Sequence, residues 1–353
     1  MSTIKVNKIE NTATADGGIA IDASGHVQID GVQLPNDGAL SGRNRILNGD
    51  MRIDQRNAGA AVTSGFPLDR WQIELFSGGG AANVEQVVDS PTDGFYYSMK
   101  VDVTTADTSL AAADVYTIMQ IIEGNNVVDL RYGLTGAKTV TVSFWVKSNV
   151  TGTFCAAVRN GDNDRCKPKE YTISSANTWE KKTLTFTGDT SGTWGRTNGR
   201  GIQLSFCLGS GTTRQGTADT WNTSEVHCTS NQTNLFASTS NEWYVTGVQL
   251  EVGEKATAFS HSSYVDELQR CQRYYEIARG LGWPRSSDNV VMGSISYKTE
   301  KRATPTLTAT KTTGGGTGTV TTFNSSVYDV GVYQTGAAAN TDCTYQVKAD
   351  AEL

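Results

Sequence analysis

Hydrophobic and polar residues alternate in short runs along most of the chain. The clearest runs lie at residues 139–146, 179–186, 201–206 and 242–250. A two-residue period is typical of β-strands that bury one face and expose the other. Because no helical period separates such runs between residue 42 and about residue 259, the pattern predicts two β-sheets packed as a sandwich of the jelly-roll type.

Residues 1–40 carry a different pattern, in which very short apolar alternations are broken by turn-forming residues. The turns lie at residues 16–18 and 22–25, and the apolar positions are Ile4, Val6, Ile19, Ile21, Val27 and Ile29. Strands this short cannot bury enough apolar surface alone, and their edges stay open. The segment is therefore predicted to be stabilised by other chains or by docking onto a larger body, with a disordered tail as the alternative.

One segment has the spacing of a helix. Ser263 and Asp266 form a capping box, and Gly280 supplies an end. The apolar stripe consists of Leu268, Cys271, Tyr275 and Ala278. The spacing predicts a linker helix over residues 263–280.

Strand patterns return after this helix, at residues 304–310 and 326–333, and predict a small C-terminal β-domain over residues 281–353. The sandwich then covers residues 41–262, and residues 1–40 form a separate N-terminal segment. Composition agrees with an all-β chain, since 37 of the 353 residues are Gly and apolar residues make up only 37%. An all-helical fold is excluded.

Charge narrows the possible partners. The formal net charge is −6, and the 30 Lys and Arg residues are scattered. They form no basic stripe that could follow a phosphate backbone, which argues against a nucleic-acid partner. No apolar run approaches the ~20 residues that span a bilayer, and the first residues lack a signal-peptide pattern. We therefore expect a soluble chain without membrane insertion or an export signal.

The six cysteines contain no C-x-x-C pair, so neither a zinc ribbon nor a disulfide framework is indicated. Small buried thiols are predicted. A hairpin disulfide between Cys155 and Cys166 is the alternative, because the two flank a turn-like sequence.

No catalytic constellation is visible in the sequence, so we expect neither an enzyme nor a cofactor. The histidines, His26, His227 and His261, lie in three separate segments without metal-binding spacing. The glycine-rich run at residues 314–318 lacks the Lys of a phosphate-binding loop. A pair of catalytic carboxylates has no sequence spacing to recognise, and four aspartates in predicted turns are expected to bond their own turn backbone: Asp162, Asp164, Asp189 and Asp219.

The tryptophans give the most specific hypothesis about ligand binding. Those within alternating strands are predicted to lie in the core: Trp145, Trp179 and Trp243. Trp194 and Trp221 stand among Gly, Asn and Thr, with Arg196 nearby, and can be exposed indoles that stack on a sugar ring. The alternative is that both fold back as lids over an end of the sandwich. Trp283 and the loop near Gly314 are further candidates for ligand contact.

Several motifs together resemble a known family. They are GRNRILNGDMRIDQR at residues 42–56, PLDRW at 67–71, SSANTWEKK at 174–182, GTADTW at 216–221, VQLEVGEKATAF at 248–259 and DELQRCQRYY at 266–275. In this order they resemble the tail fibre or receptor-binding appendage proteins of tailed bacteriophages, particularly marine phages. TIKVNKIEN at 3–11 and IDASG at 21–25 are similar to the virion-attachment end of such fibres, and ADAEL at 349–353 to their terminus.

The resemblance implies a homotrimeric structural protein of the virion, assembled in the host cytoplasm, which also accounts for unpaired cysteines. Its N-terminal segment would dock on another tail protein, such as an adaptor, nozzle or baseplate, through Ile4, Val6, Ile9, Ile19 and Ile21. Its distal domains would bind a host-surface glycan or protein, with Trp194, Arg196, Trp221 and Trp283 as candidate contacts. The central domain is also similar in layout to carbohydrate-binding jelly rolls.

The resemblance leaves open the shape of the appendage and whether the protein is an enzyme. With one short helix the chain has no long shaft, so a compact fibre, a tip or a decoration of another appendage is implied. The alternative function is a depolymerase of capsule or lipopolysaccharide, although the repeated rungs of a parallel β-helix, on which such enzymes usually sit, are not visible.

Overall fold

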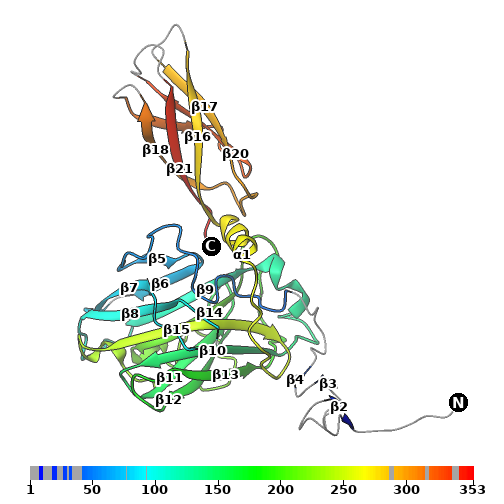
Figure 1. Ribbon diagram of the computed structural model, residues 1–353. Coiled ribbons are helices and arrows are strands. Elements are labelled where there is room, and N and C mark those ends of the chain that lie inside the picture. The colour runs from blue at the N-terminus through cyan, green and yellow to red at the C-terminus, as the bar shows by residue number, and fades with distance from the viewer. Residues whose placement is uncertain are drawn as a thin grey trace, which may run out of the picture.

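The computed structural model describes residues 8–10, 18–21, 27–29, 32–33, 42–76, 78–92, 94–285, 290–314, 318–335 and 342–353. These residues form four antiparallel β-sheets (Figure 1). Two of the sheets pack as a sandwich in the centre of the chain, and a third curls into a barrel-like C-terminal domain. The all-β class, with a central sandwich and a small C-terminal β-domain, is therefore confirmed.

The central sandwich combines a five-stranded and a six-stranded sheet. The five-stranded sheet runs in the order β13 (Glu180–Phe186), β10 (Val140–Ser148), β15 (Glu242–Val252), β8 (Ser98–Thr105) and β7 (Ala81–Val87). The six-stranded sheet runs β12 (Cys166–Ile173), β11 (Gly152–Arg159), β14 (Arg200–Ser210), β9 (Val115–Glu123), β6 (Trp71–Phe76) and β5 (Gly65–Leu68). From β8 to β15 the chain passes repeatedly between the two sheets, as in a jelly roll.

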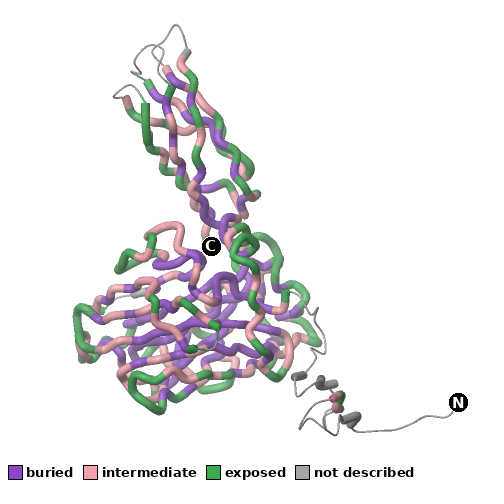
Figure 2. The backbone as a smooth tube through the Cα atoms, viewed as in Figure 1, coloured by how far each residue is buried: buried purple, intermediate pink, exposed green. Residues whose placement is uncertain are grey.

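The core of the sandwich follows from the alternation in the sequence. On β10, Val140, Val142, Phe144 and Val146 all point between the sheets and are fully buried. Phe144 meets Phe206 of the opposite sheet with ring centroids 4.9 Å apart. The four runs predicted as strands form β10, β13, β14 and β15. Buried residues accordingly concentrate between the sheets (Figure 2).

The outer faces of the two sheets differ. Residues 211–234 form most of the connection between β14 and β15 and include the short helix η3 (Thr212–Arg214). They lie over the six-stranded sheet, so that Arg159 and Gln203 on its outer face are buried. On the outer face of the five-stranded sheet, Lys181 and Thr183 are exposed and Trp145 is half-buried. Ligands can therefore reach part of this second face.

The helix is shorter than predicted. Helix α1 spans Tyr264–Gln272, and Ser263 caps it by accepting a hydrogen bond from the Asp266 amide at 3.1 Å. The predicted extension to residue 280 is wrong, because strand β16 (Tyr275–Arg285) begins there and pairs along its length with β21 (Cys343–Asp350). Tyr275 and Ala278 are three residues apart, a spacing that fits a helix but places them on opposite faces of a strand, and pairing with a distant strand overrode this local period. The C-terminal domain thus begins near residue 275, not 281.

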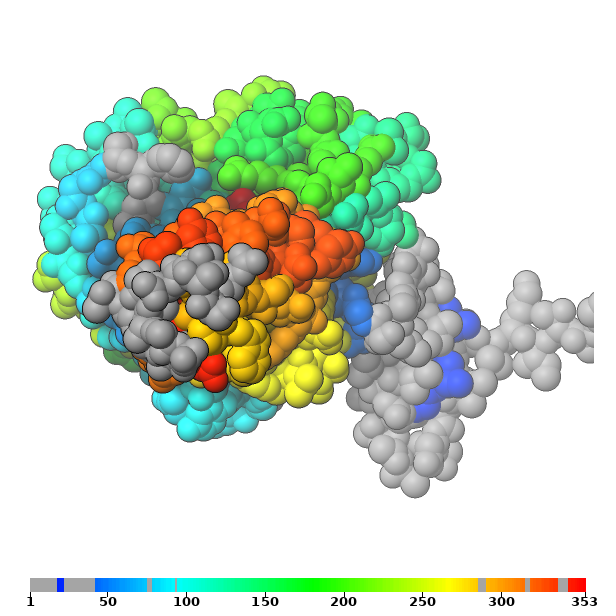
Figure 3. Space-filling view, turned by 90° about the horizontal axis from the view of Figure 1, so that it is seen from above, coloured from blue at the N-terminus to red at the C-terminus, as the bar shows by residue number. Residues whose placement is uncertain are grey.

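The C-terminal sheet runs in the order β18 (Thr306–Gly314), β21, β16, β17 (Val290–Ser296), β20 (Asp329–Gln334) and β19 (Val320–Phe323). Its edge strands β18 and β19 approach each other, so the sheet encloses a small core of its own that includes Val291, Val332 and Tyr345. Seen from above, this domain stands over part of the sandwich (Figure 3).

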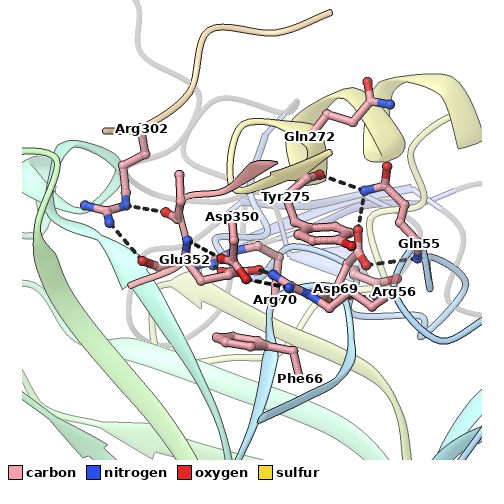
Figure 4. Close-up of polar contacts among 12 residues, drawn as sticks. Gln55, Arg56, Phe66, Asp69, Arg70, Gln272, Tyr275, Arg302, Asp350 and Glu352 are labelled. Atoms are coloured by element: carbon pink, nitrogen blue, oxygen red, sulfur yellow. Dashed lines mark hydrogen bonds and ion pairs between the residues drawn. The ribbon is translucent and has the colours of Figure 1, made fainter. Parts of the chain in front are cut away.

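The two domains are joined by ionic contacts at the C-terminal end of the chain (Figure 4). The Glu352 carboxylate pairs with the buried Arg70 of the sandwich and lies 3.3 Å from Arg56. The Arg70 guanidinium also stacks on Tyr274, 3.6 Å from the ring centroid. Next to this contact, Arg273 and Glu123 form a two-pronged pair at 2.8 and 2.9 Å, and Glu123 also accepts the Tyr274 hydroxyl.

The N-terminal segment contains a small antiparallel sheet of β1 (Lys8–Glu10), β2 (Gly18–Ile21), β3 (Val27–Ile29) and β4 (Val32–Gln33). Ile19 lies between Ile9 and Ile29 in the register. Ile19 and Ile21 are 44% and 47% exposed, so this sheet leaves apolar surface uncovered. The predicted attachment positions Ile4 and Val6 lie outside the described residues.

All six cysteines are free and buried, as predicted, and Cys155 and Cys166 do not form a disulfide. Within the described ranges, no helix has the length and apolar character needed to cross a membrane.

Candidate functional site

The structure brings two of the predicted ligand-contacting tryptophans together. Trp194 and Trp221 meet edge to face with ring centroids 5.6 Å apart, and Tyr132 packs against both. Arg196 lies beside them, and its guanidinium donates to the Tyr132 carbonyl oxygen at 3.2 Å. We call Tyr132, Trp194 and Trp221 the end cluster.

The end cluster is mainly a packing feature. Trp194 is only 6% exposed and donates its indole N–H to the Ser191 carbonyl oxygen, so the expectation of an exposed loop indole is wrong for this residue. Its polar neighbours satisfy the indole N–H locally, which lets the ring turn inward. Trp221 is half-buried and donates to the Thr187 carbonyl oxygen. Arg196 is exposed at the rim of a small pocket that Tyr132 and Trp194 help to line.

Trp283 lies apart from the end cluster, on β16 of the C-terminal domain. Its side chain is 60% exposed, as the sequence hypothesis requires. Register places Met292 directly opposite Trp283, and Tyr333 opposite Met292 on the next strand. Trp283 therefore stands in a short outward row of apolar and aromatic side chains.

A third group of aromatic residues lies on the outer face of the five-stranded sheet, where sequence reasoning did not place it. Trp145 and Trp179 were predicted to be core residues, but both are only half-buried. Because Phe144 and Val146 point inward, Trp145 between them must point outward. Trp179 precedes β13 and packs edge to face against Tyr244 of β15, with ring centroids 6.2 Å apart. Only Trp243 of the three predicted core tryptophans is fully buried.

Register orders these outward side chains into two rows. In the first row, Tyr244 of β15 lies between Lys100 of β8 and Lys147 of β10. The Lys147 ammonium lies 4.1 Å from the Tyr244 ring centroid and 5.4 Å from the Trp179 ring, both within the range of a cation–π contact.

In the second row, Trp145 of β10 lies between Thr246 of β15 and Lys181 of β13. The two rows are two residues apart on β10, or about 7 Å along the strand. We call the outward side chains of Trp145, Trp179, Tyr244, Lys147 and Lys181 the Trp145 face.

Carboxylates fix the first row in place. Asp89 accepts the Trp179 indole N–H at 3.2 Å and pairs with the Lys147 ammonium. Glu242 pairs with Lys100 at 2.6 Å and accepts the Tyr244 hydroxyl at 2.7 Å. Burial alone would lower the pKa of Lys100, but the hydrogen bond and charge of Glu242 raise it overall. Burial, followed by the hydrogen bond to Glu242, raises the pKa of Tyr244, so the phenol stays protonated.

The Trp145 face therefore combines two half-buried indoles with charged side chains on one side of a sheet, while the Tyr244 ring beside them is buried and its hydroxyl is bonded to Glu242. Aromatic rings can stack on the apolar face of a sugar ring, while neighbouring polar groups bond its hydroxyls. The sequence carried a usable signal for Trp145, since its position in the alternation is opposite to that of Phe144. For Trp179 and Tyr244, proximity depends on strand pairing that the sequence does not reveal.

Comparison with known proteins gives little further information. No family model matches the chain, and no curated protein matches it. Among solved structures, the enzymatically active domain of bacteriophage CBA120 tailspike protein 4 is similar at 13% identity and a TM-score of 0.33, over 60% of this chain and 22% of that one. The chain thus spans about a fifth of that tailspike domain.

Two further solved structures are matched over nearly their whole length. A structure described as CBM4 is 18% identical over 58% of this chain and 98% of that one, with a TM-score of 0.32. A putative sugar binding protein from Bacteroides thetaiotaomicron is 12% identical over 60% and 100%, with a TM-score of 0.35. These similarities are too low to define a function, and the fold assignment above rests on the strand pairing itself.

The described residues also contain no group of three or more His, Cys, Asp or Glu side chains arranged to hold a metal ion.

Proposed function

We propose that this chain is a glycan-binding protein of a phage tail appendage, which holds the virion to the host surface without cleaving the glycan. The Trp145 face is the observation that carries the proposal. It offers two half-buried indoles beside the charged side chains of Lys147 and Lys181, and Asp89 holds Trp179 and Lys147 in place on this face of the sheet. The order of motifs that resembles phage receptor-binding proteins supports the location.

Binding can be tested by native electrophoresis through gels that contain single soluble polysaccharides, neutral and acidic. We expect at least one polysaccharide to retard the protein and Trp145→Ala to abolish the retardation. Trp283→Ala is the matched control, because Trp283 is an exposed tryptophan on the other domain. If Trp283→Ala loses binding and Trp145→Ala keeps it, the binding surface is the C-terminal domain and not the Trp145 face.

Avidity supports the same function. A single shallow sugar site binds weakly, and repetition of the site on one particle raises the overall affinity by about 10²–10⁴ when the geometry permits simultaneous contacts. We propose a homotrimer whose N-terminal sheets cover one another or dock on a neighbouring tail protein, because Ile19 and Ile21 are exposed there. Light scattering of the full chain should give about three times 37.8 kDa. A monomer at micromolar concentration would contradict the trimer.

Attachment and binding are separable in this proposal. A chain that begins at Ser41 should keep its sheet structure and its polysaccharide binding but fail to join virions. Full incorporation of the shortened chain would show that attachment lies elsewhere.

A reducing-end assay tests whether the protein cleaves the polysaccharides that it binds. Incubation with each retarding polysaccharide should release no new reducing ends over the time that retardation persists. Release of oligosaccharides by the purified protein would replace this proposal with the depolymerase alternative.

A further inference from the structure

Lys181 differs from the other lysines near the Trp145 face in having a free ammonium group. It is exposed on β13 and makes no ion pair within the described parts of the chain. Lys100 pairs with Glu242, Lys147 with Asp89, and Lys182 with Glu180 at 2.5 Å. Only Lys181 among these four lysines has its positive charge uncompensated.

The free charge lies next to the outward indole. Register puts Lys181 directly opposite Trp145, so their Cβ atoms lie about 4.5–5.5 Å apart on the same side of the sheet. The flexible four-carbon stem of lysine can bring its ammonium to the rim of the indole ring. On the other side of Trp145 its cross-strand neighbour is the uncharged Thr246.

This arrangement suits a sugar that carries its own negative charge. A pyranose ring stacked on Trp145 would place substituents at its rim, where a carboxylate can pair with Lys181. A neutral sugar would leave the ammonium without a new partner. The edge position of β13 in the sheet leaves the site open on one side, so a long polysaccharide can pass across it.

We propose that the Trp145 face selects acidic saccharides, with Trp145 stacking on the pyranose ring and Lys181 pairing with the carboxylate of a uronic acid. This inference rests on the proposed glycan binding at the same face. Lys147 has a positioning role in it, since its charge is already paired with Asp89.

Matched polymers test the selectivity. Polygalacturonate, alginate and hyaluronan are each compared with the same polymer after chemical reduction of its carboxylates to alcohols, at 50 mM and 300 mM NaCl. We expect the wild-type protein to bind at least one acidic polymer about threefold to tenfold more tightly than its reduced form, with a smaller preference at high salt.

Variants separate the contribution of Lys181 from general charge. Lys181→Met should remove the preference while keeping the binding of the reduced polymer, and Lys181→Arg should retain the preference. Lys182→Met is the matched control, because the Lys182 ammonium is paired with Glu180, and should leave the preference unchanged.

The outcomes distinguish the two proposals. Equal binding of acidic and reduced polymers, with sensitivity to Trp145→Ala, would overturn the selectivity and keep the glycan-binding site. A preference that Lys181→Met does not change would also overturn it. If no acidic or reduced polymer binds, or if binding ignores Trp145→Ala, the proposed site fails together with the inference.

Discussion

At the scale of single residues, burial separates two kinds of tryptophan in this protein. Trp194 is 6% exposed and packs against Tyr132, whereas Trp283 is 60% exposed on its strand. Removing a large buried side chain loses its transfer free energy and leaves a cavity, but removing an exposed one does neither. Replacing Trp194 should therefore destabilise the protein far more than replacing Trp283.

Trp194→Ala should destabilise the sandwich by about 3–5 kcal/mol, because the end cluster loses a large buried ring. Trp283→Ala should change stability by no more than about 0.5 kcal/mol. Urea unfolding followed by circular dichroism measures both. A Trp194→Ala protein as stable as the wild type would show that the ring does not contribute to the core, and would restore Trp194 as a candidate for ligand contact.

The shifted pKa of Glu225 predicts part of the pH dependence of folding stability. The hydrogen bond from His227 lowers its pKa most, burial opposes this, and the charge of Arg214 lowers it further, to about 2. Because this pKa is lower in the folded state, Glu225 adds stability above the usual glutamate pKa of ~4.3, and this contribution disappears as the pH falls toward 2.

Glu225→Gln should therefore be less stable than the wild type at pH 6, and the difference should shrink between pH 4.5 and pH 2. Thermal unfolding of both proteins across this interval gives the comparison. A difference that stays constant with pH would show that the charge of Glu225 is not the cause.

At the scale of elements, α1 is held by its first turn. The Ser263 hydroxyl accepts from the Asp266 amide, and the buried Glu267 accepts from the Ser262 hydroxyl at 2.7 Å. Nine residues are too few for a stable isolated helix, so α1 depends on these contacts and on packing between the domains. This dependence explains why the helix ends where β16 begins to pair.

Ser263→Ala should cost about 1 kcal/mol of helix stability by removing the cap, while Ser263→Thr should retain most of it. Hydrogen exchange of a peptide covering Tyr264–Gln272 should then be about fivefold faster in the alanine variant than in the wild type. Unchanged exchange would mean that packing alone holds the first turn.

At the scale of the whole molecule, the last residues connect the two domains. Arg302 donates to the Ala351 carbonyl oxygen at 2.8 Å, and the Ala351 amide donates to the Tyr274 carbonyl oxygen at 2.7 Å. Glu352 then reaches the buried Arg70 in the sandwich. These contacts link the domain that carries Trp283 to the sandwich that carries the Trp145 face.

Glu352→Ala should leave the Arg70 charge buried without its partner, at a cost of about 3–5 kcal/mol at the junction. We expect the thermal unfolding of the full chain to separate into two transitions, and trypsin to cleave more quickly near the junction. Lys348→Ala is the matched control, because Lys348 is exposed on the same terminal strand. Identical unfolding curves for Glu352→Ala and the wild type would contradict the role of this ion pair.

Sequence patterns alone predicted the class of fold and much of the element order. Alternation located the strands β10, β13, β14 and β15, and the Ser263 cap located the start of the helix, because both signals depend on neighbouring residues. The alternation also indicated that Trp145 points outward, because it occupies the opposite position to Phe144, although its large apolar ring suggested burial.

Features that depend on residues far apart in the chain emerge only in the folded molecule. Residues 275–280 have a helical pattern but form a strand, because they pair with β21. Trp194 is buried because it packs against Tyr132. The Trp145 face exists only because β10, β13 and β15 lie side by side, which brings Trp145, Lys181 and Tyr244 together from three parts of the chain. Local periodicity specifies which face of a strand a residue occupies, whereas its neighbours on that face are fixed only when the sheet is formed.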